Sequence, residues 1–216
     1  VRYYPNGDTE LGVQPEAWQF GDIHAEKLPD ATLADMQGVL QAYRPKNLIL
    51  HDSLDMSSRN HHNIKSPTFR YAQHVAQQTV LGDLKRVSFV IDALAEAVPT
   101  YVKVTVIESN HDLALSKWLD TTQPGDDPEN AITWLECTLA QYRAIQNNEK
   151  DFHPLKWACY NLAGLNTDAY FHGSDDSIML AGVEHGNHGH SGPNGSKGGG
   201  ARGFAKLGVR TNTGHT

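Results

Sequence analysis

Hydrophobic and polar positions along the chain follow two alternating periods, and this alternation predicts an α/β fold. Apolar residues at helical spacing predict one helix over Asp30–Tyr43, which Pro45 ends. A second helix is expected before Pro99, and a third, amphipathic one over Pro128–Gln146.

Short apolar runs of the kind that form strands lie between these helices. The expected strands are Ala17–Phe20, Asn47–Leu50, Tyr101–Ile107, Ile178–Val183 and Gly208–Asn212. Strands that alternate with helices favour a layered sandwich in which mixed β-sheets are flanked by helices. With 216 residues, the chain has the length of a single domain.

A polar segment rich in Asp, His and Asn follows each expected strand. These segments are Gly21–His24, His51–Asp55, Ser109–Asp112, His188–His190 and Gly214–Thr216. Carboxylate, imidazole and amide groups are the ligands that a pair of divalent cations prefers. The order of strand and then polar segment predicts a metal site at one edge of the sheets.

The five segments resemble the ordered motifs of the calcineurin-like metallophosphoesterases: D-x-H, G-D-x-x-D, G-N-H-D, H and G-H-x-H. The matching residues, in order, are Asp22 and His24; Asp52 and Asp55; Asn110, His111 and Asp112; His188; and His215. The run from Glu184 to Thr216 resembles the phage-encoded nuclease branch of this superfamily. The resemblance spans Gly21 to Thr216 and implies the calcineurin-like fold.

The chain departs from the family pattern at three places. His51 and Ser109 stand where the family has glycine, and the chain stops before the last histidine of the fifth motif. We therefore expect residues 1–216 to be a single metallophosphoesterase domain within a longer chain.

The resemblance implies a site with two divalent ions. Asp22 and His24 are the expected ligands of the first ion, and Asp52 is the expected bridge. Asn110, His188 and His215 are expected at the second ion, with His185 as the rival of His188. Manganese is the expected metal and iron, zinc or magnesium are alternatives, because neither cysteine lies near a motif.

The resemblance also assigns catalytic roles. His111 is the expected proton donor to the leaving oxygen, and Asp112 is expected to orient His111 and raise its pKa. His61 and His62 follow the second motif and would contact the substrate, or else serve as hydrogen-bonded loop residues. The glycine-rich segment Gly186–Gly203 could approach a phosphate closely, and a flexible loop is the alternative.

Charge and composition restrict the partners. The net charge of −7 argues against a protein that binds nucleic acid through a basic surface. It does not exclude a nuclease, because two divalent ions would add about four positive charges where the phosphate binds. No apolar run is long enough to span a membrane, and the first residues are not expected to act as a signal peptide. Cys137 and Cys159 are expected to be buried thiols in a reducing cytoplasm, the host cytoplasm if a phage encodes the chain.

Together these features predict a metal-dependent phosphodiesterase, a DNA nuclease or exonuclease. The alternative is a phosphatase or phosphodiesterase that acts on small nucleotides or phosphoproteins. A binding module without catalytic activity is disfavoured because nearly every expected ligand type is present. No membrane partner is expected, and the sequence does not indicate an oligomeric state.

Overall fold

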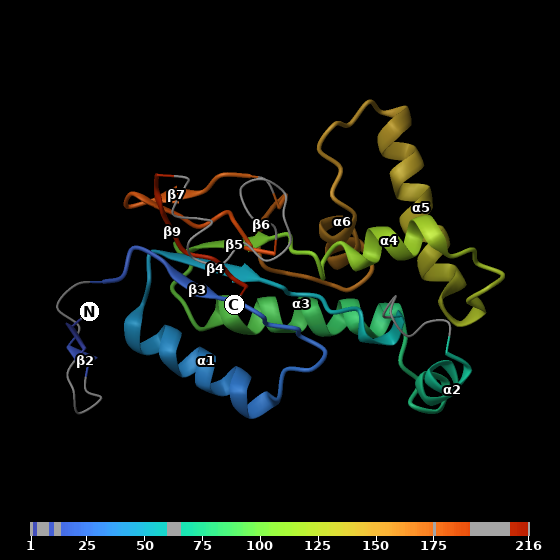
Figure 1. Ribbon diagram of the computed structural model, residues 1–216, viewed down its shortest axis with the longest axis horizontal. Coiled ribbons are helices and arrows are strands. Elements are labelled where there is room, and N and C mark those ends of the chain that lie inside the picture. Colours follow the sequence, from blue (N-terminus) through green and yellow to red (C-terminus); the bar gives the residue numbers. More distant parts are fainter. Residues whose placement is uncertain are drawn as a thin grey trace.

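A parallel four-stranded sheet forms the centre of the α/β fold (Figure 1). The computed structural model describes residues 2–3, 9–10, 14–59, 66–174, 176–190 and 208–215. The strands are β3 (Trp18–Phe20), β4 (Asn47–His51), β5 (Lys103–Ile107) and β6 (Ala169–His172), in this spatial order. All three pairings are parallel, so the carboxyl ends of the four strands lie at the same edge.

The two central strands bury nearly all of their residues because both of their faces are covered. Leu48, Ile49 and Leu50 in β4 are buried, as are Val104 and Val106 in β5. The predicted strands before the second and third motifs are confirmed, each within two residues.

Two long helices cover one face of this sheet (Figure 1). They are α1 (Asp30–Tyr43) and α3 (Val80–Glu96), which also pack against each other. The bounds predicted for α1 are confirmed. It ends at Arg44, whose left-handed backbone (φ 45°) lets its N–H group bond to the carbonyl of Leu40.

The other helices extend the molecule beyond the sheet. They are η1 (Ser57–Arg59), α2 (Pro67–Val75), α4 (Ala114–Thr121), η2 (Pro128–Asn130), α5 (Ala131–Gln146) and α6 (Pro154–Asn161). The helix predicted over 128–146 is therefore one 3-10 turn followed by α5. Cys137 and Cys159 are free, buried thiols, as predicted. In the described ranges, no helix has the length and apolar character needed to cross a membrane.

A second sheet lies on the side of the central sheet opposite α1 and α3 (Figure 1). It contains β7 (Met179–Leu180), β8 (Val183–Glu184) and β9 (Arg210–Thr211). β7 and β8 are antiparallel, whereas β8 and β9 are parallel. Mixed pairing, predicted for the sheets in general, thus holds for this sheet and not for the central one. A separate pair, β1 (Arg2–Tyr3) and β2 (Thr9–Glu10), is antiparallel.

The single strand predicted over 178–183 is wrong. Ala181 (φ 50°) and Gly182 (φ 77°) both have left-handed backbone and form the two-residue turn between β7 and β8. Two consecutive positive φ angles match the turn that joins the strands of a tight hairpin. The apolar run therefore folds back on itself.

Two glycines allow the ends of the sheets to approach each other. A Cβ atom on Gly21, which follows β3, would lie 2.1 Å from the carbonyl oxygen of Gly214, which follows β9. A Cβ atom on Gly214 would lie 2.4 Å from Cγ of His51. A larger residue would have to displace the backbone of Gly214 in the first case and the side chain of His51 in the second.

We predict that Gly21→Ala destabilises the protein by about 1–3 kcal/mol, because the added methyl group must displace the backbone at Gly214. Thermal unfolding measures the loss. Gly38→Ala is the matched control: Gly38 lies within α1 and has no atom within 4 Å of an added Cβ. This control should be neutral or stabilising by up to about 1 kcal/mol. Equal effects of the two substitutions would contradict the close approach of the two glycine segments.

Candidate metal centre

The motif residues converge at the carboxyl edge of the central sheet. Asp22 and His24 follow β3, and Asp52 follows β4. The N–H group of His24 donates to the carbonyl of Asp52 (2.7 Å), so these two loops continue side by side beyond the sheet. The N–H group of His215 donates to the carbonyl of His188 (2.8 Å), which joins the fourth motif to the fifth.

Two groups of potential ligand atoms among the described residues share Asp52. One group contains Asp22, His24 and Asp52, and the other contains Asp52, His188 and His215; the ligand atoms of each group lie within 4.8 Å of one another. Oδ2 of Asp52 is 3.1 Å from Nε2 of His188. Nδ1 of His215 is 3.7 Å from Oδ1 of Asp22. A carboxylate shared by two ligand groups is the arrangement that two neighbouring cations require.

The polar atoms at this centre are shielded from water and poorly satisfied by the protein. Asp52 and His188 are almost completely buried. Neither carboxylate oxygen of Asp52 and neither ring nitrogen of His188 has a partner in hydrogen-bond geometry, despite the short distance between them. The side-chain oxygen of Asn110 is also buried without such a partner. Burial of these atoms is costly unless another group compensates, and a bound cation would do so.

The electrostatics of the two aspartates favour a cation between them. Burial, together with the neighbouring Asp52, raises the pKa of Asp22. Burial also opposes ionisation of Asp52, but the nearby imidazole of His188 and further polar contacts outweigh it and lower the pKa to about 2. Asp52 is therefore charged at neutral pH and repels ionised Asp22, and a divalent ion would remove that repulsion.

Three of the expected ligands have an unusual backbone conformation. Asp22 (φ 47°), His24 (φ 43°) and Asp52 (φ 53°) all have left-handed backbone. This conformation is unfavourable for residues with a Cβ atom, although Asp and His adopt it more readily than most residue types. Three expected ligands thus hold their side chains toward one point at an energetic cost.

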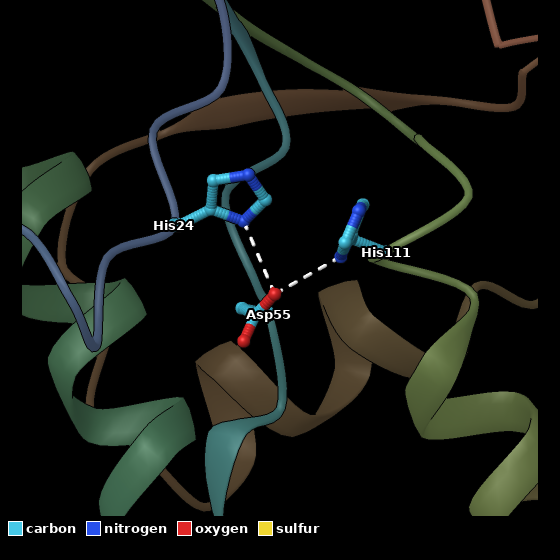
Figure 2. A group of neighbouring side chains, drawn as sticks. All are labelled: His24, Asp55 and His111. Atoms are coloured by element: carbon cyan, nitrogen blue, oxygen red, sulfur yellow. Dashed lines mark ion pairs between the residues drawn. The ribbon is translucent and has the colours of Figure 1, made fainter. Parts of the chain in front are cut away.

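A second cluster lies beside the metal centre and contains His24, Asp55 and His111 (Figure 2). Oδ1 of Asp55 is 3.0 Å from Nδ1 of His111 and 3.4 Å from Nδ1 of His24. The other carboxylate oxygen is 2.5 Å from Nζ of Lys27. The contacts with His24 and Lys27 hold the pKa of Asp55 well below its usual range. Asp55 is therefore an ionised partner for His111.

This geometry corrects the role predicted for Asp112. Oδ1 of Asp112 accepts a hydrogen bond from the N–H group of Leu54 (2.8 Å), and Oδ2 accepts one from the N–H group of Ser109 (2.9 Å). Burial raises the pKa of this carboxyl to about 7. Asp112 thus ties the loop after β5 to the loop after β4, and the carboxylate that contacts His111 is Asp55. Asp55 is the second aspartate of the D-x-x-D motif, and this spacing was the feature of the sequence that pointed to it.

His51 and Ser109, which stand where the family pattern has glycine, each have a structural role. His51 is completely buried and packs against Gly214, with its ring 5.7 Å from the ring of His188. Burial and the neighbouring His188 lower the pKa of His51 to about 3, so its ring is neutral. Oγ of Ser109 accepts hydrogen bonds from the N–H groups of His111 and Asp112 (both 3.1 Å). Ser109 therefore shapes the turn that carries the third motif.

The structure also separates the two candidates for the fourth motif. Nδ1 of His185 is 2.9 Å from Oε1 of Gln19 in β3, whereas His188 lies against Asp52. His188 is therefore the residue of the pair that faces the metal centre. His61, His62 and most of the glycine-rich segment lie outside the described residues, and the roles expected of them stay predictions.

Comparison with known proteins finds one similar curated protein. The chain is 40% identical over 221 aligned residues to Protein A1 of Escherichia phage T5. This match covers 98% of the chain and 39% of the phage protein, so the chain spans about two fifths of the length of that relative. No protein-family model matches the chain, and no solved structure does.

We predict that Asp52→Asn weakens Mn²⁺ binding at both positions, because it removes the charge that the two ligand groups share. The affinity should fall by at least roughly 10–100-fold, the range for losing an outer-sphere partner of a metal ligand. Isothermal titration calorimetry gives the affinity and the number of ions. Asp120→Asn, on an exposed carboxylate of α4, is the control and should bind like the parent protein. Unchanged binding by Asp52→Asn would contradict the shared ligand.

Proposed function

We propose that this chain is a metal-dependent phosphodiesterase of the calcineurin-like type that hydrolyses DNA with two divalent ions. The observation that supports this most strongly is the buried carboxylate of Asp52, shared by two groups of potential ligands at one edge of the central sheet. Hydrolysis of phosphate esters is the chemistry for which pairs of metal ions sharing a carboxylate are typical.

Asp22, His24 and Asp52 would hold the first ion. Asp52, Asn110, His188 and His215 would hold the second. When bound, the two ions would neutralise phosphate oxygens and promote deprotonation of an attacking water. Nitrogen and oxygen donors without a thiolate favour manganese, with iron, zinc and magnesium as alternatives.

His111 is the proposed proton donor to the leaving oxygen. Its Nδ1 faces the ionised carboxylate of Asp55 at 3.0 Å, so Nδ1 carries a proton and the other ring nitrogen is the one available to the substrate. The side chain of His111 is 33% exposed, which leaves it accessible to a ligand. Asp55 acts as a positioning residue for His111.

Lys27 adds a positive charge beside this pair. Its side chain is 61% exposed, while its ammonium group contacts Asp55. Lys27 neutralises the charge of Asp55, so two bound ions would leave the site locally positive in a chain whose net charge is −7. An anionic phosphodiester is therefore a suitable ligand.

DNA is the proposed substrate because the fourth and fifth motifs resemble the phage nuclease branch. The similarity to a protein of phage T5 is consistent with a phage-type enzyme that acts in the host cytoplasm. Purified protein with Mn²⁺ should cleave linear duplex or single-stranded DNA, and Asp52→Asn should be inactive. Faster hydrolysis of a chromogenic monoester than of either DNA would instead favour the phosphatase alternative. No activity on any of the three substrates would overturn the proposal.

We predict that His111→Ala keeps both ions but loses roughly 10²–10⁴-fold in turnover on DNA, the usual effect of removing a positioned proton donor. The loss should be much smaller for bis-nitrophenyl phosphate, since nitrophenolate leaves without protonation. Asp55→Asn should show the same dependence on the leaving group, because it acts through His111.

Two results would contradict this role for His111. Equal losses on good and poor leaving groups would make it a residue that only positions the substrate. Loss of bound Mn²⁺, measured by calorimetry on the same variant, would make it a metal ligand.

A further inference from the structure

Glu26, which belongs to none of the five motifs, binds the backbone at Asp55. Its Oε1 accepts a hydrogen bond from the N–H group of Met56 (2.7 Å). The N–H group of Asp55 lies 3.2 Å from the same oxygen and 3.1 Å from Oε2, and donates to both. Asp55 and Met56 are buried, and Glu26 is half-buried. One side chain from the loop after β3 thus binds two consecutive N–H groups in the loop after β4.

Met56 has a backbone conformation that this contact stabilises. Its φ angle is 54°, in the left-handed region, which is unfavourable for a bulky residue. The carbonyl of Met56 accepts a hydrogen bond from the N–H group of Arg59 (3.0 Å), so the chain turns here into η1. Asp55 directly precedes this turn, and the direction of its side chain therefore depends on the turn.

The carboxylate of Asp55 is held by the same segment as its backbone. Nδ1 of His24 is 3.4 Å from Oδ1, and Nζ of Lys27 is 2.5 Å from Oδ2. On the other side, Oδ1 faces Nδ1 of His111 at 3.0 Å (Figure 2). Three residues of one segment, His24, Glu26 and Lys27, therefore determine where Asp55 meets His111.

The segment around Glu26 is itself fixed in place. The N–H group of Ala25 donates to the carbonyl of Ser53 (3.0 Å). Arg86 of α3 donates to the carbonyl groups of Ala25 (3.2 Å) and Leu28 (2.8 Å). The chain on both sides of Glu26 is thus attached to other elements, so the carboxylate of Glu26 can hold the neighbouring turn in one position.

We propose that Glu26 is a positioning residue for the proton donor: it fixes the backbone of Asp55, whose carboxylate orients His111. This inference rests on the proposed function, because it gives Glu26 a part in the same reaction. A neighbouring carboxylate separates this part from a role in folding alone. Asp83 of α3 is buried and accepts a hydrogen bond from the N–H group of Ser58 (2.9 Å), three residues beyond Asp55 in the same loop.

Glu26→Ala should lower turnover on DNA by roughly 10²-fold, because a misplaced Asp55 no longer orients His111. Turnover on bis-nitrophenyl phosphate should fall much less, since its leaving group needs no proton. Glu26→Gln keeps Oε1, the oxygen within reach of both N–H groups, and should recover most of the lost turnover. Asp83→Ala is the matched control: it also removes a carboxylate that holds the loop, and any loss should be equal on the two substrates.

Circular dichroism and calorimetry with Mn²⁺ should show that each variant is folded and binds two ions. If Glu26→Ala does not fold, Glu26→Asp takes its place, because its shorter side chain withdraws the carboxylate from both N–H groups.

Crystal structures of Glu26→Ala and Asp83→Ala test the geometry independently of activity. The contact between Asp55 and His111 should be lost in the first variant and kept in the second. If His111→Ala shows no dependence on the leaving group, the proposed proton donor is wrong, and the crystal structures alone decide whether Glu26 positions this pair. An unchanged contact in Glu26→Ala overturns the inference. Loss of bound Mn²⁺ in Glu26→Ala, or equal losses on the two substrates when His111→Ala does show the dependence, also overturns it.

Discussion

The candidate site depends on one buried carboxylate, that of Asp52, which must be charged although it is removed from water. The contact with His188 keeps it ionised, and the left-handed backbone of Asp52 directs its side chain between the two ligand groups. The left-handed backbone costs free energy, and neither carboxylate oxygen has a protein partner in hydrogen-bond geometry. A pair of cations gives a physical reason for this arrangement, and the close approach of Gly21 to Gly214 keeps the surrounding loops in place.

Much of the fold and of the site could be predicted because the periodicity of single helices and strands agrees with the order of polar segments along the chain. The helix over Asp30–Tyr43 has clear periodicity and an unambiguous end, so its bounds were predicted correctly. Parallel strands that each end in a polar segment must bring those segments to one edge. The sequence therefore predicted which residues converge there, including Asp22, Asp52 and His188, without any knowledge of the distances.

The remaining features depend on contacts that a linear pattern does not contain. Asp55 and Asp112 are both acidic and both follow strands, and only packing decides which one faces His111 and which one accepts backbone hydrogen bonds. The hairpin at Ala181–Gly182 was missed because an alanine with positive φ has no sequence signature. The helix over 128–146 was recognised as amphipathic, but Leu135, Leu139 and Tyr142, which belong to its apolar pattern, are exposed.

Anomalous diffraction from crystals grown with Mn²⁺ tests the central claim most directly. The account predicts two manganese peaks roughly 3.5–4 Å apart, with the carboxylate of Asp52 between them. Asp22 and His24 should contact one ion, and His188 and His215 the other. A well-ordered Asp52 with no manganese peak beside it, or with both ions bound elsewhere on the protein, would contradict the account.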